Sequence, residues 1–168
     1  MAEATFDVHV VHEFDAPIER VWAAWTQPED LREWWGPEGF TCPSAQADVR
    51  VGGRIFVTMR APDEWGGVEQ HSTWNLVEVE APHRLRYVFR FADADGNAIT
   101  PAQAGIPADG VPDSGEHEVV LRELPDGRTR LEMTEHGYTT AESRDMSQAG
   151  LEQCLDKMSA LVEGSRRP

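Results

Sequence analysis

The 168-residue sequence contains only two cysteines, and it has no long hydrophobic run. The cysteines lack CxxC spacing, which argues against a zinc site or a redox pair and favours free thiols. No apolar stretch approaches the roughly 20 residues that a membrane-spanning helix needs, so we expect no membrane insertion. The first residues also lack the apolar segment of a signal peptide. Together these absences predict a cytoplasmic protein.

Basic residues are scarce as well. The sequence has 15 lysines and arginines against 30 aspartates and glutamates, a formal net charge of −15 at pH 7. A nucleic-acid backbone needs a basic face, and an anionic membrane surface attracts basic residues in the same way. We therefore expect neither nucleic acid nor a membrane surface as a partner. A strong net charge instead favours a monomer or a small oligomer.

Hydrophobic residues make up 40% of the chain, which is too many for a disordered protein. A chain of this length is typical of one domain and buries roughly 70% of its unfolded surface. We expect a single domain over 1–168, with its core over about 6–163 and no need for disulfides or structural metals. The sequence contains no P-loop or Rossmann glycine pattern and no compact pair of histidine ligands, so no cofactor and no metal are expected.

Hydrophobic periodicity predicts the order of the secondary structure. Residues 6–14 alternate as a half-buried strand, and helical spacing follows over about 17–25 and 28–35. Alternation then predicts six further strands, over 45–51, 54–60, 69–80, 84–91, 115–124 and 128–136. The alternation slips in phase within 69–80, which indicates a bulge. A final helix is expected over about 142–164. Short turns between strands predict an antiparallel sheet with helices on one face, the α+β class.

Residues 92–114 follow neither period. This segment contains three prolines and three glycines among many alanines and aspartates, so we interpret it as a loop insertion. A loop of this length in a compact domain is either functional or disordered. Whether it acts as a lid cannot be read from the sequence.

Several motifs resemble those of a known superfamily. They are FDAPIERVW (14–22), WTQPEDL (25–31), WWGPEGF (34–40), VGGR (51–54) and GLEQCLDK (150–157). The chain resembles the START-like or SRPBCC superfamily, also called Bet v 1-like, and within it the group related to the activator of the heat-shock-protein-90 ATPase. The resemblance implies the helix-grip fold, a curved sheet wrapped around a long C-terminal helix after two short helices. It also implies an apolar cavity between sheet and helix.

Our first functional hypothesis is a domain that holds a hydrophobic small molecule, apolar or aromatic, in this cavity. Aromatic rings on strands and an apolar helical stripe supply large contact areas, although the same residues also suit an ordinary core. The mouth would be framed by 34–40, 61–67 and 92–114. The candidate lining residues are Trp25, Trp35, Phe40, Ile55, Val57, Met59, Trp74, Tyr87, Phe89, Leu151, Cys154 and Met158.

The second hypothesis is an enzyme similar to a polyketide cyclase or hydrolase. Glu135 shares the strand parity of Leu131 and Met133, so an inward parity would carry its carboxylate into the cavity. Together with His117 or His136 it could then act as a general acid or base. The alternative is an exposed strand end.

The third hypothesis rests on the resemblance alone. It implies a co-chaperone that stimulates an ATPase, with a chaperone as partner and a role in the stress response. Separately, an exposed sheet face or the tryptophan-rich helices would suit a homodimer. The sequence identifies neither the ligand nor a reaction.

Overall fold

The structure is a computed structural model, and it describes residues 5–106 and 109–164. Its strands are β1 (Phe6–Phe14), β2 (Thr41–Ala47), β3 (Arg54–Arg60), β4 (Glu69–Glu80), β5 (Arg84–Ala92), β6 (Ser114–Glu123) and β7 (Thr129–Tyr138). Its helices are α1 (Ile18–Thr26), α2 (Pro28–Trp34) and α3 (Ala141–Gly164), with a short 3-10 helix at Asp63–Trp65. This order is the predicted one.

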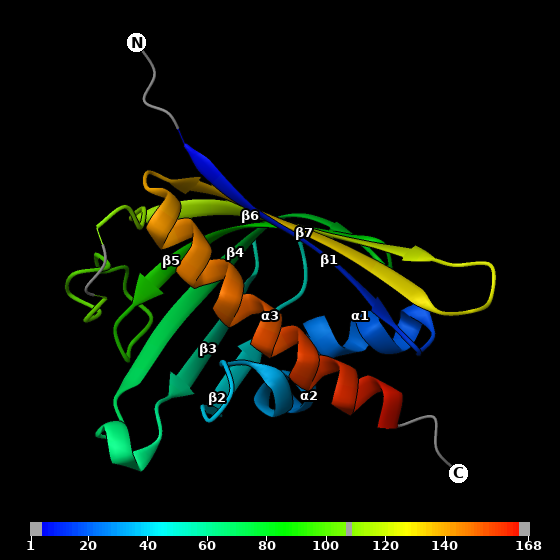
Figure 1. Cartoon of the computed structure of the whole chain (residues 1–168), viewed down its shortest axis with the longest axis horizontal. Coiled ribbons are helices and arrows are strands. Elements are labelled where there is room, and N and C mark those ends of the chain that lie inside the picture. The colour runs from blue at the N-terminus through cyan, green and yellow to red at the C-terminus, as the bar shows by residue number, and fades with distance from the viewer. Residues whose placement is uncertain (1–4, 107–108, 165–168) are drawn as a thin grey trace.

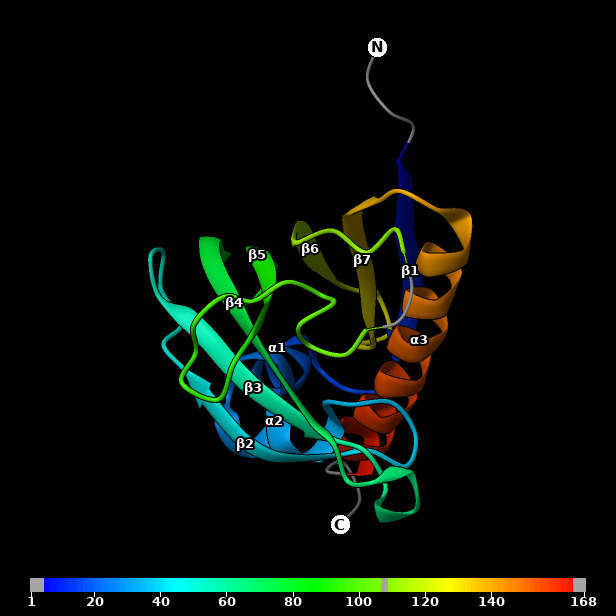
Figure 2. The same cartoon turned by 90° about the vertical axis from the view of Figure 1, so that its left-hand side faces the viewer.

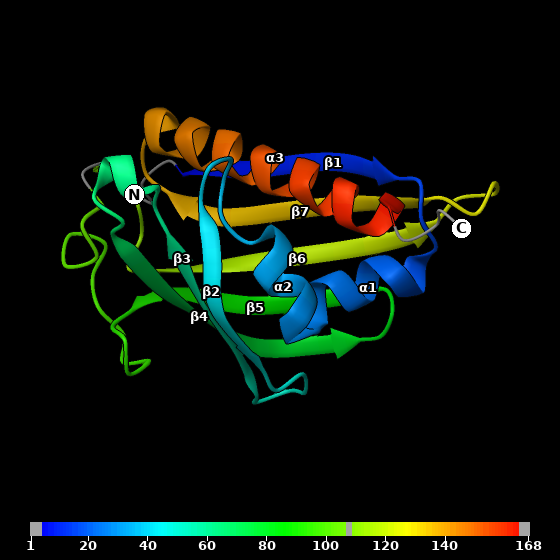
Figure 3. The same cartoon turned by 90° about the horizontal axis from the view of Figure 1, so that it is seen from below.

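The strands form one antiparallel seven-stranded sheet in the order β1-β7-β6-β5-β4-β3-β2. The first two strands of the chain therefore lie at opposite edges of the sheet. The sheet curves, and α3 lies across its concave side, as Figures 1 and 3 show. Helices α1 and α2 connect the two edge strands and lie near the C-terminal half of α3 (Figure 3). The α+β class and the helix-grip fold are confirmed.

Helix α3 is held on the sheet by an apolar stripe at helical spacing. Leu151, Cys154, Leu155, Met158 and Val162 are all buried. Helical periods of three and four place these side chains on one face, which faces the sheet. Glu152, Gln153 and Asp156 between them are exposed, so burial of this stripe determines which side of α3 faces the interior.

The phase slip predicted within 69–80 corresponds to a bulge in β4. Its pairing with β5 shifts in register between Leu76 and Glu78. A bulge inserts an extra residue and strengthens the local bend. This bend helps the sheet to curve around α3.

The prediction of a strand over 45–51 is wrong by several residues, because β2 runs from Thr41 to Ala47. Pro43 obscured the pattern, since proline cannot donate to a sheet ladder. It is tolerated here because β2 is an edge strand with a register irregularity between Thr41 and Ser44. Residues 48–53 form a turn instead, closed by a hydrogen bond from Gly53 N to Arg50 O.

The segment between β5 and β6 is a loop in its described residues, and residues 107–108 lie outside them. Near its start, Asp93 Oδ1 accepts hydrogen bonds from the backbone of Asp95 and Asn97. Near its end, Gly110 O accepts a hydrogen bond from Thr139 N at the junction of β7 and α3. Figure 2 shows the loop crossing the end of the molecule where α3 begins. The first part of the loop is thus closed on itself, and its end is tied to the junction of β7 and α3.

Candidate functional site

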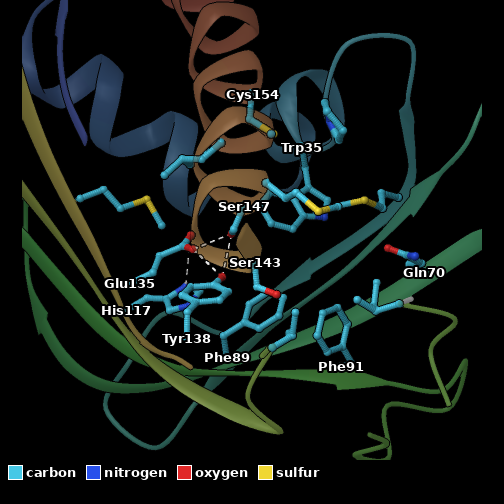
Figure 4. A pocket seen from close by; sticks show the side chains of 18 of the residues that line it. Trp35, Gln70, Phe89, Phe91, His117, Glu135, Tyr138, Ser143, Ser147 and Cys154 are labelled. Carbon is cyan, nitrogen blue, oxygen red and sulfur yellow. Dashed lines mark hydrogen bonds and ion pairs between the residues drawn. The ribbon is translucent and has the colours of Figure 1, made fainter. Parts of the chain in front are cut away.

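A cavity of about 290 Å³ lies between α3 and the concave side of the sheet. This volume is close to the lower end of the range for small-molecule pockets, roughly 300–1,000 Å³. Strands β3 to β7 supply one wall and the first half of α3 the other, as Figure 4 shows for the labelled side chains. Trp35 and Pro37, which follow α2, close one side of the cavity. Ile106 and Val111 of the 92–114 loop also border it.

The sheet wall is largely aromatic. Tyr87, Phe89 and Phe91 share the inward parity of β5, and the rings of Phe89 and Phe91 meet edge to face at 5.3 Å between centroids. Edge-to-face pairs are favourable arrangements for aromatic rings. This wall therefore offers both ring faces and ring edges to anything that enters the cavity.

The helical wall contains a glycine where the other members of the stripe carry side chains. Gly150 lines the cavity, and a Cβ added there would meet no atom within 4 Å. Glycine is unfavourable inside a helix by roughly 1 kcal/mol relative to alanine. Its position leaves space in the cavity that any larger residue would occupy.

The structure brings together six of the residues that the sequence analysis proposed as lining. These are Trp35, Met59, Tyr87, Phe89, Leu151 and Cys154. They come from the α2–β2 connection, β3, β5 and α3. Burial raises the pKa of the Cys154 thiol to about 11, so this residue contributes a neutral, apolar surface near neutral pH.

The other six proposed residues lie outside the lining. Phe40 is half-buried and packs against Trp65, with 6.0 Å between ring centroids. The remaining five are buried in the core: Trp25, Ile55, Val57, Trp74 and Met158. The strand residues among them, Ile55, Val57 and Trp74, point inward as expected. Helical side chains fill the space at Trp74, where Trp25 of α1 contacts its ring. Of the segments expected at the mouth, 61–67 contributes no lining residue within the described part of the chain.

A polar cluster stands at the wall formed by β6, β7 and α3. Glu135 Oε1 accepts hydrogen bonds from the hydroxyls of Tyr138, at 2.8 Å, and Ser147, at 2.9 Å. The two hydroxyl oxygens lie 2.7 Å apart. His117 Nδ1 lies 3.8 Å from Glu135 Oε2. Figure 4 shows the four side chains converging. The chain thus places a carboxylate, an imidazole and two hydroxyls in contact inside an apolar cavity.

Burial shifts the pKa values of His117 and Tyr138, two members of this cluster. Glu135 and His117 are each only 6% exposed. Burial lowers the pKa of His117, and the nearby Glu135 carboxylate opposes this only in part. Burial also raises the pKa of Tyr138, and the charge of Glu135 acts in the same direction. His117 is therefore neutral and Tyr138 protonated around neutral pH.

Of the two histidines proposed beside Glu135, the structure brings only His117 to it. His136 is exposed on the other face of β7, where its Nδ1 lies 3.0 Å from Asp7 Oδ2. Adjacent residues of a strand point to opposite faces, so Glu135 and His136 are separated by the sheet.

Two members of the polar cluster, Tyr138 and Ser147, were not predicted from the sequence as site residues. Simple alternation puts residue 138 on the face opposite to Glu135. The pairing of β1 with β7 shifts in register between Phe6 and Val8, opposite this segment, and Gly137 has a φ of 108°. A glycine in this region permits the local kink that returns Tyr138 to the inner face. For Ser147 a signal was available, because it lies three and four residues before Gly150 and Leu151 on the same helical face.

The cavity lining contains one carboxylate, Glu135, and no lysine or arginine, as far as the described residues go. The arginines of β5 lie on the outer face of the sheet, where Arg84 pairs with Glu118 and Arg86 with Glu116. In residues 5–106 and 109–164, no group of three or more His, Cys, Asp or Glu could hold a metal ion. No helix in those ranges is long and apolar enough to span a membrane.

Fold and cavity together define a helix-grip domain of the START-like class. Residues 15–163 match the family model described as Activator of Hsp90 ATPase homolog 1-like protein. The chain belongs to this family, which confirms the resemblance drawn from its motifs. Membership supports a ligand-binding domain in general and specifies neither a ligand nor an activity. Location, partners and any role in stress remain predictions.

Solved structures of similar bacterial proteins share the fold. A crystal structure from Chromobacterium violaceum is 28% identical with a TM-score of 0.75, covering 94% of this chain and 96% of that one. A crystal structure from Mycobacterium smegmatis is 26% identical with a TM-score of 0.72, covering 93% and 90%. The solution structure of an AHSA1-like protein from Aeromonas hydrophila is 25% identical with a TM-score of 0.71, covering 95% and 94%. Among curated proteins, no significant match was found.

Proposed function

We propose that this protein binds a small molecule, apolar or aromatic over most of its surface, in the cavity between α3 and the sheet. The observation that carries the proposal is an internal space of about 290 Å³ whose walls are mainly aromatic and aliphatic. Transfer of apolar surface from water contributes roughly 25 cal/mol per Å², before the costs of association are subtracted. A ligand of modest size would gain enough from these walls to bind.

Two variants on neighbouring residues of α3 test this proposal. Gly150→Leu places a side chain in the open space of the cavity, whereas Ala149→Leu places the same side chain on an exposed position of the same helix. Native mass spectrometry of the purified wild type would identify a retained ligand. Calorimetric titration with a neutral aromatic probe, 2-phenylethanol, would measure binding directly.

We expect wild type and A149L to bind the probe and G150L to lose binding at least about tenfold. Unchanged binding by G150L would place the probe elsewhere and contradict the proposal. A wild type that neither retains a ligand nor binds any small aromatic probe would also contradict it.

A second candidate function is proton transfer, which the contact between Glu135 and His117 in an apolar cavity favours. Glu135 would take a proton from the carbon next to a carbonyl, and the electron pair would move onto the carbonyl oxygen. A hydrogen bond from neutral His117 would stabilise that oxygen, while the Tyr138 hydroxyl orients the Glu135 carboxylate. Return of the proton to carbon restores the compound, so no co-reactant is needed.

Hydrogen–deuterium exchange tests this activity without knowledge of the natural substrate. In D2O, the protein should accelerate the loss of the α-proton NMR signal of phenylacetone, and Glu135→Gln should bring the rate back to background. Equal rates with and without wild-type protein would argue against proton transfer. The role as a chaperone partner rests on family analogy, and a pull-down with a purified chaperone ATPase would test it.

A further inference from the structure

We infer that the ligand is a small aromatic amine, bound with its ring against the apolar walls and its ammonium group at Glu135. This inference rests on the proposed binding function and specifies its ligand class. It starts from Glu135, the one carboxylate among the described lining residues, which is more than nine-tenths buried. A buried charge is costly unless a partner compensates it.

The hydrogen bonds of Glu135 leave one oxygen available. Oε1 accepts both the Tyr138 and the Ser147 hydroxyls. Oε2 makes no hydrogen bond within the described part of the chain, and its polar neighbour is His117 Nδ1 at 3.8 Å. This separation is longer than a direct hydrogen bond. The carboxylate is thus oriented by two hydroxyls on one side and can accept a further donor on the other.

No cation of the protein compensates this carboxylate within the described lining. His117 is neutral because burial lowers its pKa. Lys157 is occupied elsewhere, since its ammonium donates to the carbonyls of Gly36 and Phe40. Arg144 lies on α3 outside the lining and pairs with Asp145. A neutral hydroxyl could donate one hydrogen bond to the carboxylate, whereas an ammonium group would supply several donors and the compensating charge.

The rings around the carboxylate favour a cation too. Phe89 stacks on the His117 ring at 5.1 Å, and Tyr87 meets that ring edge to face at 5.3 Å. Aromatic faces attract ammonium groups through the quadrupole of the ring. The net charge of −15 also draws cations toward the protein and repels anions. Carboxylate and overall charge therefore select the same ligand chemistry.

Three probes of similar shape separate this inference from simple apolar binding. 2-Phenylethylamine carries a positive charge near neutral pH, 2-phenylethanol is neutral and 3-phenylpropanoate is negative. Calorimetric titration of the wild type should show the amine binding about tenfold tighter than the alcohol, and the carboxylate weakest. An amine that binds no tighter than the alcohol overturns the inference, although the proposed binding function would survive. If none of the three binds, both fail.

A pair of charge-removing variants then locates the effect. Glu135→Gln keeps the shape of the side chain, and Glu132→Gln removes the same charge on the same strand, from a residue that lies on the outer face beside Arg130. We expect E135Q to abolish the preference for the amine while retaining the alcohol, and E132Q to behave like the wild type. An equal loss of the preference for the amine in both variants would indicate a general charge effect. It would overturn the assignment of the ammonium site to Glu135. The probe comparison on wild-type protein stands even where E135Q fails to fold.

Discussion

His117 is enclosed by Tyr87, Phe89 and Glu135, and its environment shows how burial and charge compete at one residue. Burial favours the neutral imidazole, and the carboxylate favours the charged one. Burial is the larger effect, so the pKa of His117 in the folded protein lies below that of the unfolded chain, about 6.5. We therefore expect the free energy of unfolding to depend on pH through this side chain.

The sign of that dependence follows from proton counts. Above about pH 6.5 His117 is neutral in both states, but below it the unfolded chain binds a proton that the folded protein does not. The free energy of unfolding should therefore fall as the pH is lowered from about 7.5 to about 5.5, and fall less in His117→Gln. Urea unfolding followed by circular dichroism at both pH values would measure this. Parallel losses in the two proteins would show that His117 is not the cause.

Side-chain packing also explains why the sequence could not distinguish residues that line the cavity from residues in the core. Trp74 and Tyr87 both point inward from neighbouring strands, and their rings stack at 5.0 Å with an angle of 14°. Tyr87 lines the cavity, whereas Trp74 is in the core. Alternation determines the face of a sheet on which a side chain lies. It carries no information about the depth to which opposite helices fill that face.

At the scale of elements, α3 fixes the wall that carries Trp35 and Pro37. Lys157, the only lysine in the sequence, donates to Gly36 O at 2.9 Å and to Phe40 O at 3.1 Å. These carbonyls belong to the connection between α2 and β2. One side chain of α3 thus fastens both ends of that connection to the helix.

Removing this ammonium should loosen the connection. In Lys157→Met, which keeps much of the apolar stem, we expect a loss of about 1–3 kcal/mol in the free energy of unfolding, because two hydrogen bonds from a charged donor disappear. Arg122→Met removes the same charge at an exposed position of β6 and should cost much less. Urea denaturation of the two variants provides the comparison. Equal stabilities would mean that the two carbonyls are as well satisfied by water.

Element boundaries were predictable where one periodicity applied without interruption. The alternation in β5 and the stripe of α3 gave their limits to within a residue or two, and the phase slip gave the bulge of β4. The prediction failed at β2 because Pro43 argues against a strand unless the strand is known to lie at an edge. Edge position is a property of the whole sheet, so local sequence could not supply it.

At the scale of the whole molecule, the net charge of −15 opposes the compact state through repulsion among carboxylates. The ion pairs on the outer face of the sheet, such as those of Arg84 and Arg86, are partly exposed, and surface pairs contribute roughly 0–1 kcal/mol each. Repulsion should therefore outweigh them.

Added salt screens both the repulsion among carboxylates and the attraction within the ion pairs, so its effect on stability shows which of the two is larger. We expect the melting temperature to rise when NaCl is increased from about 10 mM to about 200 mM, because the Debye length then falls below typical distances between surface charges. Differential scanning calorimetry would show the shift, with KCl as a control for specific ion effects. A melting temperature that falls with salt would mean that the ion pairs dominate.

The tryptophan cluster has an optical consequence. Ring centroids are separated by 4.9 Å between Trp34 and Trp25, 6.1 Å between Trp25 and Trp74, and 5.0 Å between Trp74 and Trp35. Excitation energy passes readily between indoles at such separations, so we expect the emission of these four rings to be coupled. Because Trp35 also borders the cavity, anything that quenches it would dim the whole set. The intrinsic tryptophan fluorescence should therefore report whether the cavity is occupied.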